Sequence, residues 1–219
     1  MKKLVSIFMV LTLLLSFAAC SDNKNNESSS SAPQQSSNQN STSSEESNSQ
    51  NDSSAPTETD SKSLVVYFSW SGNTENVAKS IQSQTDSDIF EIVPSTPYSD
   101  DYDTVLDLAQ EEQRSNARPA ISGSIESIEQ YDVIYVGFPN WWGDMPMILY
   151  TFFDTYDLSG KTVALFCTSG GSGLSNTVNE VKGLEPNATV TDGLQIGSSS
   201  ASNPDDAVSE WLNNIGLAK

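Results

Sequence analysis

The chain has 219 residues and a net charge of −19, with 29 acidic side chains against 10 basic ones. This balance argues against nucleic acid as a partner, because phosphate backbones are bound by basic surfaces. The chain also contains no histidine, which excludes Ser-His-Asp triads, histidine acid–base chemistry and the commonest transition-metal ligand.

The first twenty residues have the pattern of an export signal. Two lysines follow the first methionine, an apolar run begins at Leu4, and residues 16–20 read Ser-Phe-Ala-Ala-Cys. The apolar run is shorter than the ~20 residues needed to cross a bilayer. The segment resembles a bacterial lipoprotein signal, in which the cysteine is lipidated and becomes the new N-terminus. We therefore expect a signal peptide at residues 1–19 and a lipid on Cys20. An ordinary secretory signal, in which this cysteine has no role, is the alternative.

Residues 20–62 are expected to form a disordered tether between the membrane and a folded domain. After Cys20 the composition falls to Ser, Asn, Gln, Asp and Glu, with no aromatic or large aliphatic side chain to bury. Such a segment cannot offset the entropy of ordering its backbone. Residues 63–219 remain, which is a length suited to one domain with its own core.

Within residues 63–219, apolar runs of strand length alternate with segments of helical period. Five strands alternating with helices imply a parallel sheet covered by helices on both faces. The predicted fold class is therefore α/β, with an open, doubly wound, five-stranded parallel sheet. In chain order we predict a strand at 64–68, a helix at 74–84, a strand at 89–93, a helix at 102–114, a strand at 133–138, a helix at 146–154, a strand at 162–167, a helix at 175–182, a weaker strand within 188–196, and a helix from 203 to about 216.

The first predicted strand ends in a turn that is crowded with hydroxyl and amide side chains. Residues 68–78 read FSWSGNTENVA, whereas a short capped connection needs only one such side chain. Ligands of open parallel sheets bind at the carboxyl ends of the strands. Backbone N–H groups and the start of the next helix would form an anion site there, with Ser69, Ser71, Asn73 and Thr74 as donors. The alternative is that this segment only turns the chain and caps the helix.

Two further strands also end in unusual loops. Residues 138–146 read FPNWWGDMP, with two indoles beside a glycine, and residues 167–173 read CTSGGSG, with side chains too small to fill a cleft. Taken singly, the tryptophans fit a core or an interface, and the glycine run fits a flexible turn. Taken together, the loop after the first strand suits an anion, the loop at 138–146 offers flat aromatic rings, and the loop at 167–173 leaves room for a flat ligand. Cys167 is expected to be a buried small hydrophobe.

At these three loops the sequence resembles the flavodoxin family, in its short-chain form, whose members bind FMN. The likeness extends from about Leu64 to Ile215 and implies the strand order 2-1-3-4-5. It also implies that the first loop binds the FMN phosphate and that the other two enclose the isoalloxazine ring. The cofactor-binding residues implied are Ser69, Trp70, Ser71, Gly72, Asn73, Thr74, Pro139, Asn140, Trp141, Trp142, Gly143, Asp144, Thr168, Ser169, Gly170 and Gly171.

The resemblance implies two finer features of residues 139–146, which we name the aromatic loop. We expect Trp142 to stack on the ring more than Trp141 does, because Trp142 adjoins the glycine. In flavodoxin-like sites one loop peptide can flip to bond with the ring, and this requires a positive φ. Gly143 is the only glycine of the loop, which makes the peptide between Gly143 and Asp144 the candidate.

The function implied is electron transfer by an FMN protein that is anchored outside the cytoplasm, on the outer face of the membrane or in the cell envelope. The cofactor carries the chemistry, so neither a catalytic side chain nor a metal is expected. The negative charge predicts a basic redox protein or surface as partner, with an association that weakens as salt rises. Two alternatives remain open, although we expect an electron carrier. One is an NAD(P)H-dependent reductase of quinones or similar acceptors, and the other is a flavin-free module whose tryptophans bind another ligand or a protein.

Overall fold

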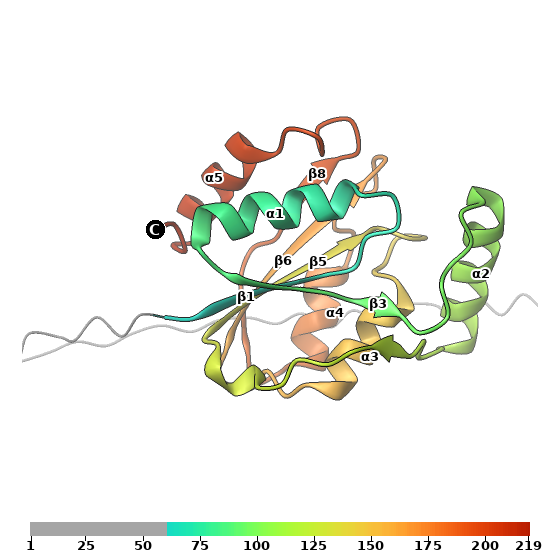
Figure 1. Cartoon of the computed structure of the whole chain (residues 1–219), viewed down its shortest axis with the longest axis horizontal. Helices are drawn as coiled ribbons and strands as arrows, with labels where there is room; N and C mark the ends of the chain where they lie inside the picture. Colours follow the sequence, from blue (N-terminus) through green and yellow to red (C-terminus); the bar gives the residue numbers. More distant parts are fainter. Residues whose placement is uncertain (1–60) are drawn as a thin grey trace, which may run out of the picture. The chain divides into compact units, whose positions relative to one another are not determined.

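The computed structural model describes residues 61–219, which form an α/β domain. The predicted signal peptide, the lipidation of Cys20 and nearly all of the tether lie outside the described residues. No helix in this part of the chain is long and apolar enough to span a membrane. The elements in chain order are β1 Ser63–Tyr67, α1 Asn73–Thr85, β2 Asp88–Glu91, β3 Val93–Pro94, α2 Tyr102–Ser115, β4 Ile121–Ser122, η1 Ile128–Gln130, β5 Val133–Pro139, α3 Met147–Thr155, β6 Thr162–Ser169, α4 Thr177–Leu184, β7 Thr189–Val190, β8 Leu194–Gly197 and α5 Asp205–Asn214 (Figure 1).

The main sheet is parallel and has the order β2-β1-β5-β6-β7, with β8 also paired to β6. This is the expected order 2-1-3-4-5, except that the fifth strand is divided into β7 and β8, which pair with opposite ends of β6. Gly193 lies between the two halves. A Cβ atom there would lie 3.2 Å from the Leu165 carbonyl oxygen and 2.7 Å from the Leu174 side chain. The chain can therefore pass this close to β6 only because residue 193 is a glycine.

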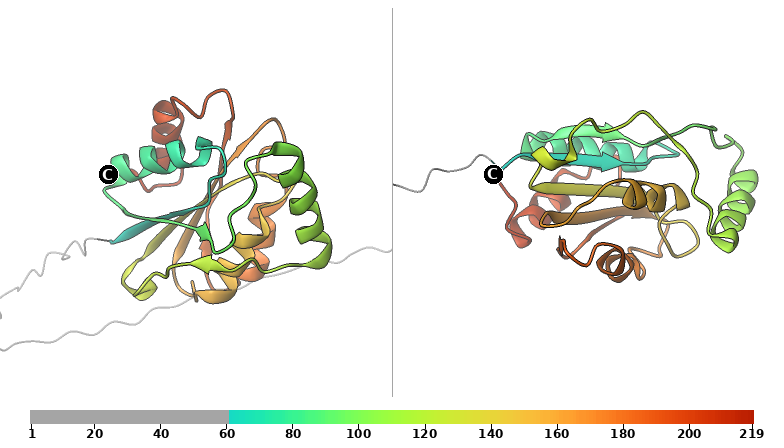
Figure 2. Two further views of the ribbon diagram at one scale, coloured as in Figure 1. Left: turned by 45° about the vertical axis from the view of Figure 1, so that its right-hand side comes forward. Right: turned by 90° about the horizontal axis from the view of Figure 1, so that it is seen from below.

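The strand predicted at 89–93 is also divided, and this division determines where α2 lies. β2 stays in the main sheet, whereas β3 pairs with β4 in a small antiparallel sheet that the sequence did not predict. Pro94 has no N–H to donate to a central ladder, which favours the departure. The segment between β3 and β4 carries α2 to a position beyond the carboxyl ends of the strands, away from both sheet faces (Figure 1 and Figure 2). The sheet is covered by helices on both faces as predicted, but α2 is not one of these helices.

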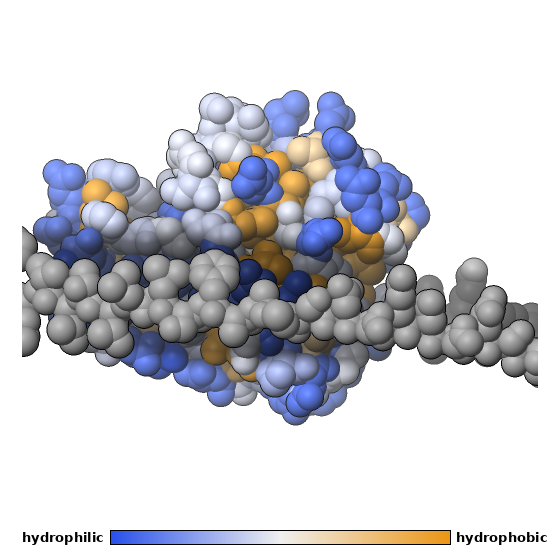
Figure 3. Space-filling view, turned by 180° about the vertical axis from the view of Figure 1, so that it is seen from behind, coloured by the Kyte–Doolittle hydropathy of each residue, from blue (hydrophilic) through white to orange (hydrophobic). Residues whose placement is uncertain are grey.

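The other four helices cover the sheet as predicted. On one face, Ile81 of α1 and Trp211 of α5 pack with Tyr135 of β5. On the other face, Phe152 of α3 packs with Val136 of β5, alongside residues of α4. The central strands are thus buried on both sides, as their continuous apolar runs indicated. Cys167 is buried and carries a free thiol. Seen from behind, the outer surface shows apolar residues surrounded by hydrophilic ones (Figure 3).

Candidate functional site

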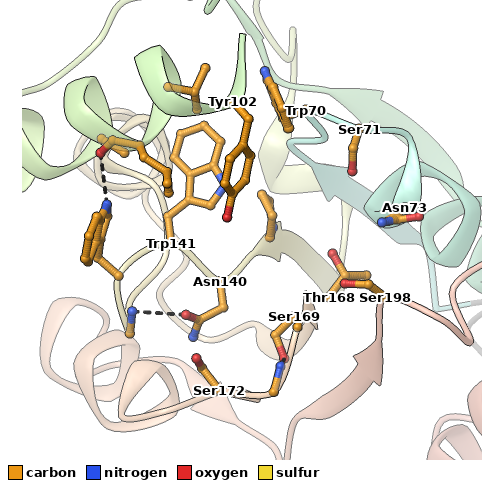
Figure 4. A pocket seen from close by; sticks show the side chains of 18 residues that line it. Trp70, Ser71, Asn73, Tyr102, Asn140, Trp141, Thr168, Ser169, Ser172 and Ser198 are labelled. Carbon is orange, nitrogen blue, oxygen red and sulfur yellow. Dashed lines mark hydrogen bonds between the residues drawn. The ribbon is translucent and has the colours of Figure 1, made fainter. Parts of the chain in front are cut away.

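The three loops meet at the carboxyl edge of the sheet and line a cavity of about 650 Å³ (Figure 4). This volume lies within the range of roughly 300–1,000 Å³ that is usual for small-molecule sites. The lining residues are Trp70, Ser71, Asn73, Tyr102, Val105, Leu106, Ala109, Pro139, Asn140, Trp141, Trp142, Gly143, Thr168, Ser169, Gly170, Gly171, Ser172 and Ser198.

Most of the predicted cofactor-binding residues line this cavity, whereas Ser69, Gly72, Thr74 and Asp144 are not part of its surface. The sequence did not indicate that six further residues line the cavity. These are Ser172, Ser198 and the α2 residues Tyr102, Val105, Leu106 and Ala109. The helical period of α2 was recognisable, but a period does not say which neighbour the apolar face will meet.

The first loop, residues 69–72, leaves the start of α1 free to bind a ligand. Gly72 precedes the helix with a φ of +83°, and no side chain caps the helix. Within the described residues, the backbone N–H groups of residues 69–75 have no backbone acceptor. The first backbone hydrogen bond of the helix runs from Asn76 N to Gly72 O. The structure therefore lacks the side-chain cap of the alternative interpretation, and the binding of a ligand by this turn stays a prediction. Free N–H groups at a helix start form a site for an anion.

Ser69 and Thr74 differ in how their hydroxyl groups are used. Ser69 Oγ is buried and has no hydrogen-bond partner among the described residues. Such a group costs about 1–3 kcal/mol and is rare in native proteins unless a ligand or water satisfies it. Thr74 Oγ1 lies 2.9 Å from Thr168 Oγ1 in the interior. The Ser69 hydroxyl thus has no partner within the described protein, whereas the Thr74 hydroxyl joins the first loop to the third.

The aromatic loop makes a tight turn at Trp142 and Gly143. Trp141 N donates to Asp144 O at 2.8 Å, and Asp144 N donates back to Trp141 O at 3.1 Å. The φ angles are +55° at Trp142 and +82° at Gly143, which is the pattern of a type I′ turn. Gly143 thus occupies the left-handed region, and the flip of the peptide between Gly143 and Asp144 stays a prediction. The positive φ at Trp142 was not expected, because it costs a residue other than glycine about 1–2 kcal/mol.

Asn140 holds the aromatic loop against the third loop. Its Oδ1 accepts a hydrogen bond from Gly143 N at 3.0 Å, and its Nδ2 donates to Gly173 O at 2.9 Å. Within the third loop, Ser169 Oγ accepts from Gly173 N at 2.9 Å. The side chains of Asn140 and Ser169 therefore serve mainly to shape the two loops, although both also face the cavity (Figure 4).

Asp144 anchors the end of the turn to α3. Its Oδ2 accepts a hydrogen bond from the Tyr150 hydroxyl at 2.8 Å, and its Oδ1 accepts from Met145 N at 2.7 Å. Burial raises the pKa of Asp144 above its usual value, and the two hydrogen bonds offset part of this rise. The carboxyl group therefore stabilises the loop and does not face the cavity.

The two indoles of the aromatic loop have different surroundings. Trp141 is half-buried and packs edge-on against Phe68 and Tyr98, with ring centroids 5.4 and 5.2 Å apart. Trp142 is 52% exposed. Both line the cavity, so the expectation that Trp142 stacks more on a bound ring stays a prediction.

Gly170 in the third loop leaves open space beside the cavity. A Cβ atom added there would meet no atom within 4 Å, and its φ is outside the left-handed region. Neither the backbone nor the protein packing therefore requires a glycine at this position. A ligand that approaches the backbone closely would require one. No group of His, Cys, Asp or Glu side chains in residues 61–219 is arranged to hold a metal ion.

Comparison with known proteins finds similarity to flavodoxins and flavoproteins. A family model described as flavodoxin matches residues 62–215. A candidate flavoprotein from Bacteroides eggerthii has 33% identity and a TM-score of 0.64, with 71% of this chain and 98% of that one covered. A flavoprotein from Lactobacillus acidophilus, solved in complex with FMN, has 28% identity and a TM-score of 0.56, with 68% of this chain and 99% of that one covered. A search of curated proteins finds no match.

Proposed function

This chain belongs to the flavodoxin family, and from that membership we propose that it binds FMN at the carboxyl edge of its sheet and transfers electrons between redox partners. The observation that carries the proposal is the buried Ser69 hydroxyl, which lacks a partner beside the uncapped start of α1. A phosphate oxygen at this point would accept hydrogen bonds from Ser69 and from the free backbone N–H groups. The FMN complex of the Lactobacillus acidophilus flavoprotein supports the same ligand.

The two ends of the cavity suit the two ends of FMN. Near the first loop, the wall presents the hydroxyl and amide groups of Ser71, Asn73 and Ser198, which suit a phosphate and a polyol chain (Figure 4). At the other end, Trp141 and Tyr102 present aromatic surface, which suits a flat ring. The residues present therefore fit this cofactor.

When bound, FMN supplies the one- and two-electron chemistry, so the protein needs no acid, base or nucleophile of its own. The chain's part is to bind and orient. The free N–H groups of residues 69–75 hold the phosphate without an ion pair, since Lys79 is exposed and paired with Glu75. Asn140 sets the spacing between the aromatic loop and the third loop, and Gly170 leaves the ring room to approach the backbone.

The cellular setting is a separate part of the proposal. The signal-like first twenty residues support export and lipid anchoring through Cys20. The charge of −19 favours a positively charged redox protein or surface as partner, because opposite charges steer association.

Titration of the purified protein with FMN tests the binding. We expect saturable binding of one FMN per chain, detected as quenching of FMN fluorescence. Absence of binding would favour a flavin-free module. Stopped-flow mixing of the FMN-loaded protein with NADH or NADPH then separates the two redox functions. An electron carrier should not be reduced directly, so rapid bleaching of the flavin absorbance would favour the reductase.

Metabolic labelling with a fatty acid tests the anchor. We expect label in the wild-type protein and none in Cys20→Ser, because lipidation requires the cysteine. Label retained in Cys20→Ser, or absent from both proteins, would contradict the anchor and leave FMN binding unaffected.

A further inference from the structure

We propose that α2 is a wall of the cofactor site and that Gln113 and Trp142 are positioning residues that clamp the aromatic loop to it. The functional half of this inference rests on the proposed binding of FMN, and the structural half stands on contacts within the chain. α2 lies beyond the carboxyl ends of the strands (Figure 1), where Tyr102, Val105, Leu106 and Ala109 line the cavity.

The buried face of α2 is directed at the cavity. Val105 and Ala109 are the buried residues of this helix, and both belong to the cavity wall. Gln113 follows Ala109 by four residues and so lies on the same face. The other four long helices bury their apolar faces against the sheet. The amphipathic pattern of α2 is therefore explained by the site and not by the sheet.

Gln113 holds the backbone at the start of the turn. Its Nε2 donates a hydrogen bond to Trp141 O at 2.9 Å. The same carbonyl oxygen accepts from Asp144 N at 3.1 Å, which is the bond that closes the turn. Gln113 thus fixes the orientation of the peptide between Trp141 and Trp142. A change in this peptide would move both indoles relative to the cavity.

Trp142 makes the second connection to α2. Its Nε1 donates to the Leu106 carbonyl oxygen at 3.0 Å (Figure 4). The side chain is 52% exposed and its backbone has a φ of +55°, so neither burial nor backbone preference accounts for an indole here. The hydrogen bond to α2 does account for it, because phenylalanine or leucine could not make that bond.

The two hydrogen bonds make α2 and the aromatic loop one unit. Opening of this unit would remove its contacts with a ring bound between it and the third loop. The clamp should therefore slow the release of FMN and preserve the contacts between the loop and the ring, on which the potential of the bound cofactor depends.

The test compares each variant with a control that carries the same substitution at another position. Gln113→Met keeps the length of the side chain without the donor, and Trp142→Phe keeps an aromatic ring without the N–H. Gln110→Met is the first control, since Gln110 lies on the same helix and contacts Arg114. Trp211→Phe is the second, since Trp211 Nε1 donates to Asp192 O at 2.9 Å in another part of the domain.

The first measurement needs no cofactor. In the FMN-free protein, hydrogen exchange at the amides of residues 141–145 should be about two- to tenfold faster in Gln113→Met and Trp142→Phe, as expected for the loss of one hydrogen bond. In the FMN-loaded protein, the release of FMN should accelerate by a similar factor of about two to ten, and the reduction potential should shift. The two controls should match the wild type in every measurement.

The outcomes separate the two halves of the inference. Unchanged exchange in both variants would overturn the clamp. Faster exchange with unchanged FMN release and unchanged potential would overturn its role in the site. Failure of the wild type to bind FMN would refute the proposed function, and hydrogen exchange would then still decide the clamp.

Discussion

Replacing Ser69 by alanine should have opposite effects on the protein with and without FMN. In the structure, Ser69 Oγ is buried and has no partner among the described residues. A buried hydroxyl without a hydrogen bond costs about 1–3 kcal/mol. Its removal should therefore raise the free energy of unfolding of the FMN-free protein by about 1 kcal/mol, which corresponds to roughly 2–4 °C in Tm for a domain of this size.

With FMN present, the sign reverses. The hydroxyl would then donate a hydrogen bond to the phosphate, and a bond to a charged group contributes about 1.5–3 kcal/mol. Loss of this bond should raise the Kd for FMN by about 10- to 150-fold. The free start of α1 would still bind the phosphate through its backbone N–H groups, so binding should be weakened and not abolished.

Two assays measure the two effects of Ser69→Ala. Thermal unfolding followed by circular dichroism reports the stability of the FMN-free protein, and a fluorescence titration reports the affinity for FMN. Ser209→Ala is the control, because Ser209 is exposed on α5. If the variant without FMN were less stable than wild type and its affinity for FMN were unchanged, the Ser69 hydroxyl would not be reserved for a ligand.

Three further results are expected. Gly170→Ala should hardly change the stability of the FMN-free protein, since the new Cβ atom meets nothing within 4 Å, but it should weaken FMN binding by about 1–3 kcal/mol through overpacking; equal affinities in a titration would contradict this. Burial raises the pKa of Glu112, although its hydrogen bond from Tyr98 opposes the rise. The stabilising contribution of Glu112 is therefore present at acid pH and lost as the pH rises through the folded pKa. Glu112→Gln should accordingly have a Tm advantage over wild type near about pH 8 that disappears towards about pH 4, whereas Glu111→Gln, at an exposed position, should show no such trend. Finally, the rate of electron transfer to a basic partner protein should fall as ionic strength rises, and a rate independent of salt would remove the argument for steering.

The sequence by itself determined the local features of the domain. The apolar runs at 64–68, 133–138 and 162–167 specify central strands, because a strand buried on both faces needs an apolar side chain at nearly every position. The three loops could be found for a similar reason. Their hydroxyls, indoles and glycines serve no purpose in a simple connection, and the carboxyl ends of parallel strands meet at one edge. The strand order came from the resemblance to a family and not from the pattern.

Only the tertiary structure decided the features that depend on contacts between distant segments. The sequence shows that α2 is amphipathic, but only the folded chain places its apolar face on the cavity. The sequence also made Ser69 and Thr74 equal candidates for the phosphate, whereas in the structure Thr74 bonds to Thr168 and Ser69 is left without a partner. In the same way, Gln113 carries no signal of its own until α2 is placed beside the aromatic loop. The physical reason is that propensity and period act within about ten residues, whereas the partner of a buried face or a hydrogen-bonding group is chosen when the whole domain packs.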